Sequence, residues 1–335
     1  MSAPVTRGRP IELHRGELRV TGTALALDAR RRAACAFVSH AHGDHIGRHD
    51  RTIATAPTLA LMRHRLGEPR RKPTEALPAG YRAPFGLGEL TLELFSAGHV
   101  LGSAQLRVSR GNLAVAYTGD LCTEPTHAAE PAEVVPCDVL VMESTFGHPR
   151  YVFPPKAETL AAIRKFVDDA FADGVTPVLL GYALGKAQEI LKYLSDLGYR
   201  CRAHPTVQAV NRVYEAHGVS LENVRPLGPE GPARDEVVVA PPNLARGAAM
   251  RGVGRKRTAI LTGWAVDGAR WFRGVDAAFP LSDHADFPSL VRYAKASGAG
   301  RVFTVHGHAG PLAAALRKEG LRAEPLKEQA QLELL

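Results

Sequence analysis

The sequence contains few cysteines, and their spacing argues against two classes of small stabilised domain. The four, Cys35, Cys122, Cys137 and Cys201, lie far apart and form no Cys-x-x-Cys pair. Neither a disulfide framework nor a zinc ribbon is therefore indicated. We interpret these cysteines as small buried side chains.

Long apolar runs are also missing. No stretch of 18 apolar residues occurs, and residues 1–20 lack an apolar segment of signal-peptide length. We therefore expect no membrane-spanning helix, no membrane partner and a cytoplasmic protein. With 335 residues, 45% of them hydrophobic and 23% charged, the chain is long enough for one large domain or two ordinary ones.

Acidic residues are outnumbered by basic ones. The chain has 42 Lys and Arg against 34 Asp and Glu, a net charge of +8, which favours a polyanionic partner. No acidic residue occurs between residues 241 and 266, and we expect the basic residues there to contact nucleic-acid phosphates, with solvated surface as the alternative. This cluster comprises Arg246, Arg251, Arg255, Lys256 and Arg257. A second cluster, diluted by Glu68, comprises Arg63, Arg65, Arg70, Arg71 and Lys72.

Three histidines and an aspartate are concentrated in six residues, in the pattern His40-x-His42-x-Asp44-His45. In an extended loop His40, His42 and Asp44 point one way and His45 the other, so the loop offers ligands to two metals. Imidazole and carboxylate suit zinc, manganese or iron, and the lack of a nearby cysteine argues against a closed structural zinc site. The alternative is a solvated histidine-rich loop.

Further candidate site residues directly follow predicted strands. A rigid sheet can hold such residues in positions precise enough for chemistry. Several strands that each end in a candidate residue therefore predict that these residues lie together at one edge of the sheet. Strand 35–39 leads into the histidine loop, 90–95 into His99, 113–117 into Asp120, 139–142 into Glu143, and 301–305 into His306.

The pattern of elements changes twice along the chain. Short antiparallel strands are expected over residues 11–27, a helix over 58–66, and then a loop to about Gly88. Longer helices follow Pro155 and alternate with strands at 176–180, 236–240 and 258–262. After these strands the pattern of the first section, strands that end in candidate site residues, returns. We therefore predict one domain, residues 1–152 and 265–335, interrupted by an insertion at 153–264.

The histidine loop, together with His99, Asp120 and His306, resembles the metallo-β-lactamase superfamily, with Asp28 where that superfamily keeps a structural aspartate. Three further segments look like motifs A, B and C of the β-CASP nucleases, and a fourth resembles the start of their inserted cap domain. These are Glu143-Ser-Thr-Phe-Gly, Ser282-Asp-His284-Ala-Asp, Val305-His306-Gly and Gly181-Tyr-Ala-Leu-Gly-Lys186-Ala-Gln-Glu189. The resemblance covers essentially the whole chain and is strongest to the bacterial exonucleases associated with ATP-dependent DNA ligases.

The resemblance implies an α/β fold, a four-layer αβ/βα metallo-β-lactamase sandwich with an inserted α/β β-CASP cap domain. It also implies two divalent ions, Zn²⁺ or Mn²⁺. His40, His42 and His99 would bind one ion, Asp44, His45 and His306 the other, and Asp120 would bridge them. His284 would donate a proton to the leaving oxygen or bind the scissile phosphate, oriented by Glu143, the alternative being a purely structural pair. Lys186 is a further candidate for nucleic-acid contact.

The implied function is a two-metal nuclease that hydrolyses phosphodiester bonds in DNA, an exonuclease on DNA ends in repair that acts in the same pathway as a DNA ligase or helicase. An RNA-processing enzyme of the RNase J or polyadenylation-subunit type would use the same site on a different strand. A thioester or lactone hydrolase shares the histidine loop but needs neither Glu143 nor His284. A non-catalytic scaffold subunit would have lost metal ligands, and here each ligand position is occupied.

Overall fold

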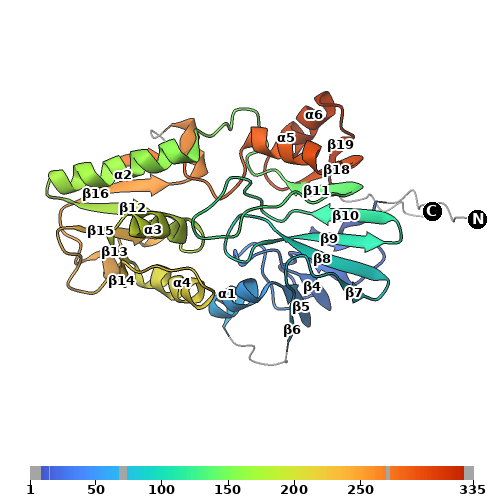
Figure 1. The fold of residues 1–335 in the computed structure, drawn as a ribbon, viewed down its shortest axis with the longest axis horizontal. Coiled ribbons are helices and arrows are strands. Elements are labelled where there is room, and N and C mark those ends of the chain that lie inside the picture. The colour runs from blue at the N-terminus through green and yellow to red at the C-terminus, as the bar shows by residue number, and fades with distance from the viewer. Residues whose placement is uncertain (1–8, 15, 68–73, 269–271, 328–335) are drawn as a thin grey trace, which may run out of the picture.

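The computed structural model describes residues 9–14, 16–67, 74–268 and 272–327, which form two blocks lying side by side (Figure 1). One block contains two facing β-sheets, and the other contains a third sheet with its own helices. None of the described helices is both long enough and apolar enough to cross a membrane.

The first sheet has the strand order β1-β2-β3-β4-β5-β6. Its first three strands pair antiparallel, which confirms the expectation for residues 11–27, and the others pair parallel. The strands are β1 (Ile11–His14), β2 (Glu17–Val20), β3 (Leu25–Leu27), β4 (Cys35–Phe37), β5 (Arg51–Ala54) and β6 (Glu75–Pro78).

The second sheet has the order β19-β18-β11-β10-β9-β8-β7 and combines early and late parts of the chain. Val139 of β11 pairs with Arg301 of β18, so the last section completes a sheet that the first section begins. The strands are β7 (Phe85–Leu87), β8 (Leu90–Ser96), β9 (Ala104–Arg110), β10 (Leu113–Tyr117), β11 (Val139–Glu143), β18 (Arg301–Val305) and β19 (Ala323–Pro325).

The two sheets bury their main apolar core between them, with Phe37 and Ile53 on one side and Leu92, Leu106 and Phe303 on the other. Helices α5 (Phe287–Ala296) and α6 (Ala309–Lys318) cover the outer face of the second sheet. Helix α1 (Ala56–Leu66) lies beside the first sheet and contacts β6. Helices therefore flank a pair of facing sheets, and the predicted α/β sandwich is confirmed.

The third sheet consists of parallel strands in the order β14-β13-β15-β12-β16-β17. Helices α2 (Lys156–Ala172), α3 (Lys186–Asp196) and α4 (Pro205–Ala216) share an apolar core with one face, and the segment 241–255 packs Met250 and Val253 on the other. The strands are β12 (Thr176–Leu180), β13 (Arg200–Ala203), β14 (Val224–Pro226), β15 (Glu236–Ala240), β16 (Lys256–Leu261) and β17 (Ala277–Phe279).

One sequence expectation needs correction. The loop expected up to Gly88 is wrong, because it includes the edge strands β6 and β7. Most side chains of β6 are exposed and show no apolar alternation, and β7 is only three residues long. The third sheet continues beyond residue 264, since β17 pairs with β16.

The two blocks are joined by apolar packing and hydrogen bonds. Leu61 and Met62 of α1 share an apolar cluster with Val210 and Tyr214 of α4, and the Tyr214 hydroxyl accepts a hydrogen bond of 3.3 Å from the Leu101 amide. This contact fixes one end of the boundary along which the candidate site residues lie.

Candidate functional site

Asp28 holds the histidine loop in position. Its Oδ1 accepts the Ser39 amide at 2.6 Å, and its Oδ2 accepts the hydroxyls of Ser39 at 2.6 Å and Tyr117 at 2.8 Å. Oδ2 also lies 2.9 Å from Nδ1 of His45. One carboxylate thus fixes both the start of the loop after β4 and the orientation of the His45 ring.

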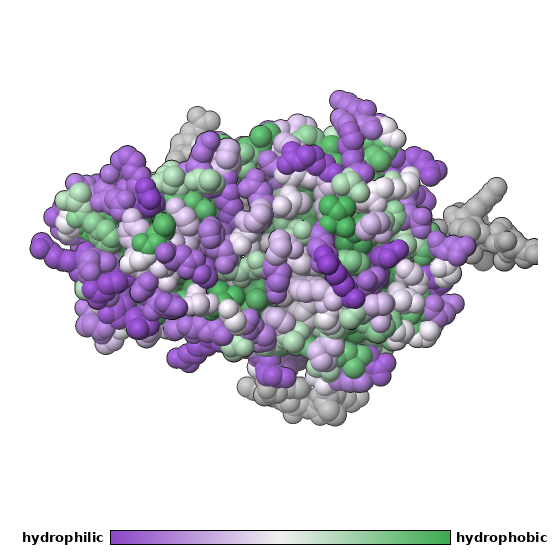
Figure 2. Space-filling model, viewed as in Figure 1, coloured by the Kyte–Doolittle hydropathy of each residue, from purple (hydrophilic) through white to green (hydrophobic). Residues whose placement is uncertain are grey.

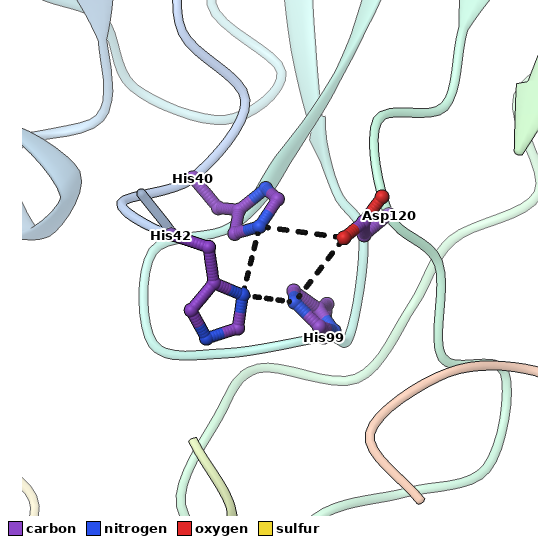
Figure 3. Close-up of side chains that lie close together, drawn as sticks. All are labelled: His40, His42, His99 and Asp120. Atoms are coloured by element: carbon purple, nitrogen blue, oxygen red, sulfur yellow. Dashed lines mark hydrogen bonds and ion pairs between the residues drawn. The ribbon is translucent and has the colours of Figure 1, made fainter. Parts of the chain in front are cut away.

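Four predicted ligands converge into one tight cluster (Figure 3). Nδ1 of His42 lies 3.0 Å from Nε2 of His40 and 2.9 Å from Nε2 of His99. Oδ2 of Asp120 is 3.5 Å from the same nitrogen of His40 and 3.7 Å from that of His99. These four donor atoms all lie within 4.8 Å of one another, so they suit a divalent cation with nitrogen and oxygen ligands.

The second nitrogen of each histidine in this cluster is held by another group. Nδ1 of His40 is 3.0 Å from the Ser39 hydroxyl, and Nε2 of His42 is 3.1 Å from the Leu184 carbonyl. Nδ1 of His99 lies 2.6 Å from the carbonyl of Asp283. Such partners fix the tautomer and ring orientation of metal-binding histidines. The carbonyls of Leu184 and Asp283 could not be predicted from the sequence, because any residue type can supply a backbone acceptor.

The protonation states of the cluster also fit a metal. Burial lowers the pKa of His42 to about 4, and burial together with neighbouring imidazoles holds the pKa of His40 and His99 well below the usual range. Metal ligands must be deprotonated, so three neutral imidazoles with convergent nitrogens are prepared for a cation.

The second predicted ligand group is more open. Nε2 of His45 lies 3.5 Å from Oδ2 of Asp120 and 3.7 Å from Oδ2 of Asp44, whose side chain is 74% exposed. The exposed ring of His306 lies 5.9 Å from the His45 ring. Burial lowers the pKa of His45, but Asp120 and Asp28 raise it more, to about 10. A cation bound there would have to displace the proton of His45. Asp120 faces both this ligand group and the buried cluster.

His284 and Glu143 form a pair beside the cluster, in which Glu143 is buried and His284 is partly exposed. Nδ1 of His284 lies 3.1 Å from Oε1 of Glu143, and its Nε2 is 3.9 Å from Oδ2 of Asp120. Glu143 also accepts the amides of Leu121 at 2.6 Å and Thr145 at 3.1 Å. Because Leu121 follows Asp120 in the chain, Glu143 positions both His284 and the Asp120 turn.

Electrostatics keep His284 protonated and Glu143 ionised. Burial lowers the pKa of His284, but the carboxylates of Glu143 and Asp120 outweigh it and raise the pKa to about 9. Burial raises the pKa of Glu143, and attraction to His284 reverses this shift, so its pKa lies below the usual value. The pair therefore places an imidazolium next to Asp120.

Lys186 and Asp283 form a second buried pair that connects the two blocks. Nζ of Lys186 donates a hydrogen bond to Oδ1 of Asp283, and both side chains are less than a tenth exposed. Lys186, which was predicted to contact nucleic acid, is thus paired with a carboxylate of its own chain. Asp283 was missed as a site residue, although it lies within the quoted motif Ser282-Asp-His284.

A cavity of about 1480 Å³ opens along the boundary between the blocks. It is lined on one side by His42, Asp44, His45 and Asp120, and it reaches His284 and His306. Its other wall consists of the segments that follow β12, β15 and β16, since the carboxyl ends of these parallel strands point to the same edge. Five of the seven candidate ligands therefore lie on the wall of a large open cleft, whereas His40 and His99 are buried and do not line it.

The predicted basic cluster lies largely outside this cleft. β16 runs parallel to β12, so Arg255, Lys256 and Arg257 surround the end of β16 that is far from the cavity, and Arg257 pairs with Asp173. None of the five residues, Arg246 and Arg251 included, is among the described residues lining the cavity. Hydrophilic side chains cover much of the outer end of this block in Figure 2, as expected of solvated surface.

Other basic residues do line the cleft. Arg30 and Arg31 follow β3, and Arg65 lies in the last turn of α1. Arg65 belongs to the second basic cluster of the sequence, of which Arg70, Arg71 and Lys72 lie outside the described residues.

No known family profile matches the chain. It is 41% identical over 310 residues to a protein of Opitutus terrae named "Probable DNA ligase", covering 92% of this chain and 30% of that protein. It is 37% identical over 123 residues to Endoribonuclease ysh1 of Aspergillus fumigatus, covering 36% of this chain and 14% of the relative. It is 26% identical over 180 residues to an RNase J-like protein of Methanocaldococcus jannaschii, covering 48% and 43%. The chain therefore spans less than half the length of each of these relatives.

Proposed function

The chain belongs to the β-CASP family of metallo-β-lactamase-fold proteins, and from this membership we propose that it is a metal-dependent nuclease that hydrolyses phosphodiester bonds in DNA. The observation that carries the proposal is the position of the His284–Glu143 pair, next to the Asp120 cluster in a cleft that three arginines help to line. Together they provide a cation site, a proton donor and room for a polyanionic strand.

In the proposed mechanism His40, His42, His99 and Asp120 would hold one divalent cation, and His45, Asp44 and His306 would contribute to a second, with Asp120 facing both groups. When bound, such cations lower the pKa of water and neutralise charge developing on a phosphate. His284 donates the proton at Nε2 to the leaving oxygen, and Glu143 holds the opposite ring nitrogen so that Nε2 faces the reaction. Asp28 fixes the orientation of the His45 ring, and the Asp283 carbonyl fixes that of the His99 ring.

DNA is the proposed substrate because the relative that aligns with almost the whole chain is named a probable DNA ligase. We further propose that the enzyme shortens DNA ends in repair, in the same pathway as a DNA ligase or helicase. The two-block division, with the third sheet as an inserted cap, belongs to the same proposal.

An RNA-processing nuclease is the second candidate, supported by the similarity to an endoribonuclease and an RNase J-like protein. A thioester or lactone hydrolase is less well supported, since it would not need the His284–Glu143 pair or the arginines that line the cleft.

The decisive experiment is metal-supplemented digestion of one oligonucleotide sequence, prepared as single-stranded DNA and as RNA and labelled in turn at each end. Stepwise shortening of DNA, absent in Asp120→Ala, is the expected result and gives the polarity. Preferential cleavage of RNA would favour the second candidate, and loss of neither strand with zinc or manganese would contradict a nuclease.

The rate should fall on the alkaline side as His284 loses its proton. A raised pKa means that the imidazolium is present at neutral pH and is lost as the pH rises through about 9. Nearby divalent cations repel it, so we expect the limb at or below that pH. Turnover measured between about pH 6 and 10 would show it, and Glu143→Gln should move it to lower pH because a neutral amide no longer favours the charged ring. If the alkaline limb of Glu143→Gln does not shift, Glu143 does not control the titration of His284.

A further inference from the structure

Two exposed aromatic rings line the cleft on the side of the third sheet. Large apolar side chains are notably exposed at only a few described positions, Val134, Val152, Tyr182, Leu197 and Trp264. The two aromatic ones, Tyr182 at 60% and Trp264 at 41%, both line the cavity. Exposed rings gathered in a cleft mark a binding surface more often than single scattered residues do.

Adjacent parallel strands bring these rings to the same edge. Tyr182 follows the end of β12, Trp264 follows the end of β16, and the two strands pair directly, with Leu180 opposite Ile260. Neighbouring strands lie about 4.8 Å apart, so residues leaving them at the same end are within the span of a dinucleotide.

Both rings are anchored by contacts that lead back to His284. The Trp264 ring lies 4.6 Å from that of Phe146, which in turn lies 6.1 Å from His284. A Cβ on Gly263 would come within 2.6 Å of the Phe146 ring, so the absence of a side chain there permits this packing. Nζ of Lys186, paired with Asp283, lies 5.0 Å from the centroid of the Tyr182 ring, a cation–π contact.

The wall contributed by the other block carries three basic side chains, Arg30, Arg31 and Arg65, in addition to the carboxylates of Glu17, Asp28, Asp44 and Asp120. Aromatic rings combined with basic side chains along one groove are the usual means of binding unpaired nucleic acid, because bases stack on the rings while phosphates contact the cations. Bases in a duplex are already stacked on both faces and cannot use such rings.

We propose that Tyr182 and Trp264 form a stacking platform for the bases next to the scissile phosphate, so that the substrate is an unpaired strand bound without base preference. This inference rests on the proposed nuclease function and specifies its substrate. Each base presents a π-face, so the platform tolerates any sequence.

Binding tests the platform without requiring cleavage. Fluorescence anisotropy of a labelled single-stranded oligonucleotide would be measured in a His284→Ala background, so that the strand is not consumed. Tyr182→Ala should weaken binding roughly 5- to 100-fold, as loss of a stacking ring does, whereas Tyr182→Phe keeps the ring and should bind as before. At Trp264, which is packed against Phe146, phenylalanine is used so that the variant does not misfold. Leu197→Ala is the control, because it removes an exposed side chain that does not line the cavity.

An abasic scan locates the stacked bases. A single abasic site placed at successive positions should weaken binding sharply at one or two of them, and the same site should add little to the loss in Tyr182→Ala, as coupled partners require. Equal binding by Tyr182→Ala and its background, a flat scan, or equally tight duplex binding would each overturn the platform. Failure of the wild-type protein to cleave any strand would instead contradict the nuclease function and leave a ring-dependent binding result standing.

Discussion

Replacing His284 by alanine is expected to lower turnover roughly 10²- to 10⁴-fold, the usual contribution of a general acid, while metal content stays at the wild-type level. The reason is geometric. The four-residue cluster of His40, His42, His99 and Asp120 is complete without His284, whose Nε2 lies 3.9 Å from Asp120. The imidazolium is held by Glu143 and is not one of those four residues.

Elemental analysis of the purified variant, set beside its single-turnover rate, separates the two roles of His284. Glu143→Gln is the matched comparison, since it keeps the imidazole ring and removes the carboxylate charge that favours its protonated form. Loss of metal in His284→Ala would make this histidine a ligand, and a turnover within a few fold of wild type would reduce the pair to a structural one.

The second large effect concerns the Lys186–Asp283 ion pair. Replacing Lys186 by methionine should lower the free energy of unfolding by about 3–5 kcal/mol, because it leaves a buried carboxylate without its counter-charge. Burial raises the pKa of Asp283, but the attraction of Lys186 and nearby histidines outweighs it and keeps this pKa well below the usual range. Asp283 is thus strongly dependent on its partner.

Chemical denaturation followed by fluorescence would measure this loss. Lys192→Met, on the same helix, breaks the exposed pair with Asp196 and should cost less than about 1 kcal/mol. The double variant Lys186→Met/Asp283→Leu removes both charges and should recover much of the stability. Similar losses in Lys186→Met and Lys192→Met would show that the buried pair does not hold the blocks together.

The sheet edge that carries the candidate ligands could be predicted from the sequence because its strands have a clear apolar pattern and end abruptly. The strands expected before His99, Asp120 and His306 are present as β8, β10 and β18, with ends within one residue of those predicted. Buried strands of this kind carry a clear pattern, and the residues that follow them are placed by the sheet rather than by local preference.

Other features could not be predicted because they depend on direction and packing. A basic run reads as one patch, yet a strand of six residues spans about 17 Å, so Lys256 at the start of β16 lies far from Trp264 beyond its end. Lys186 has the residue type of a phosphate contact, and only the fold shows Asp283 beside it. The exposed edge strand β6 lacks the apolar alternation that would have revealed it.

The pairing of β11 with β18 also has a consequence for synthesis of the protein. Val139 and Arg301 are partners in the sheet, and the whole third-sheet block is translated between them. Contacts so distant in sequence close late and slowly during folding. While the chain is being made, the histidine loop therefore leaves the ribosome long before His284 and His306 do, so the candidate site cannot form until both of these residues have been added.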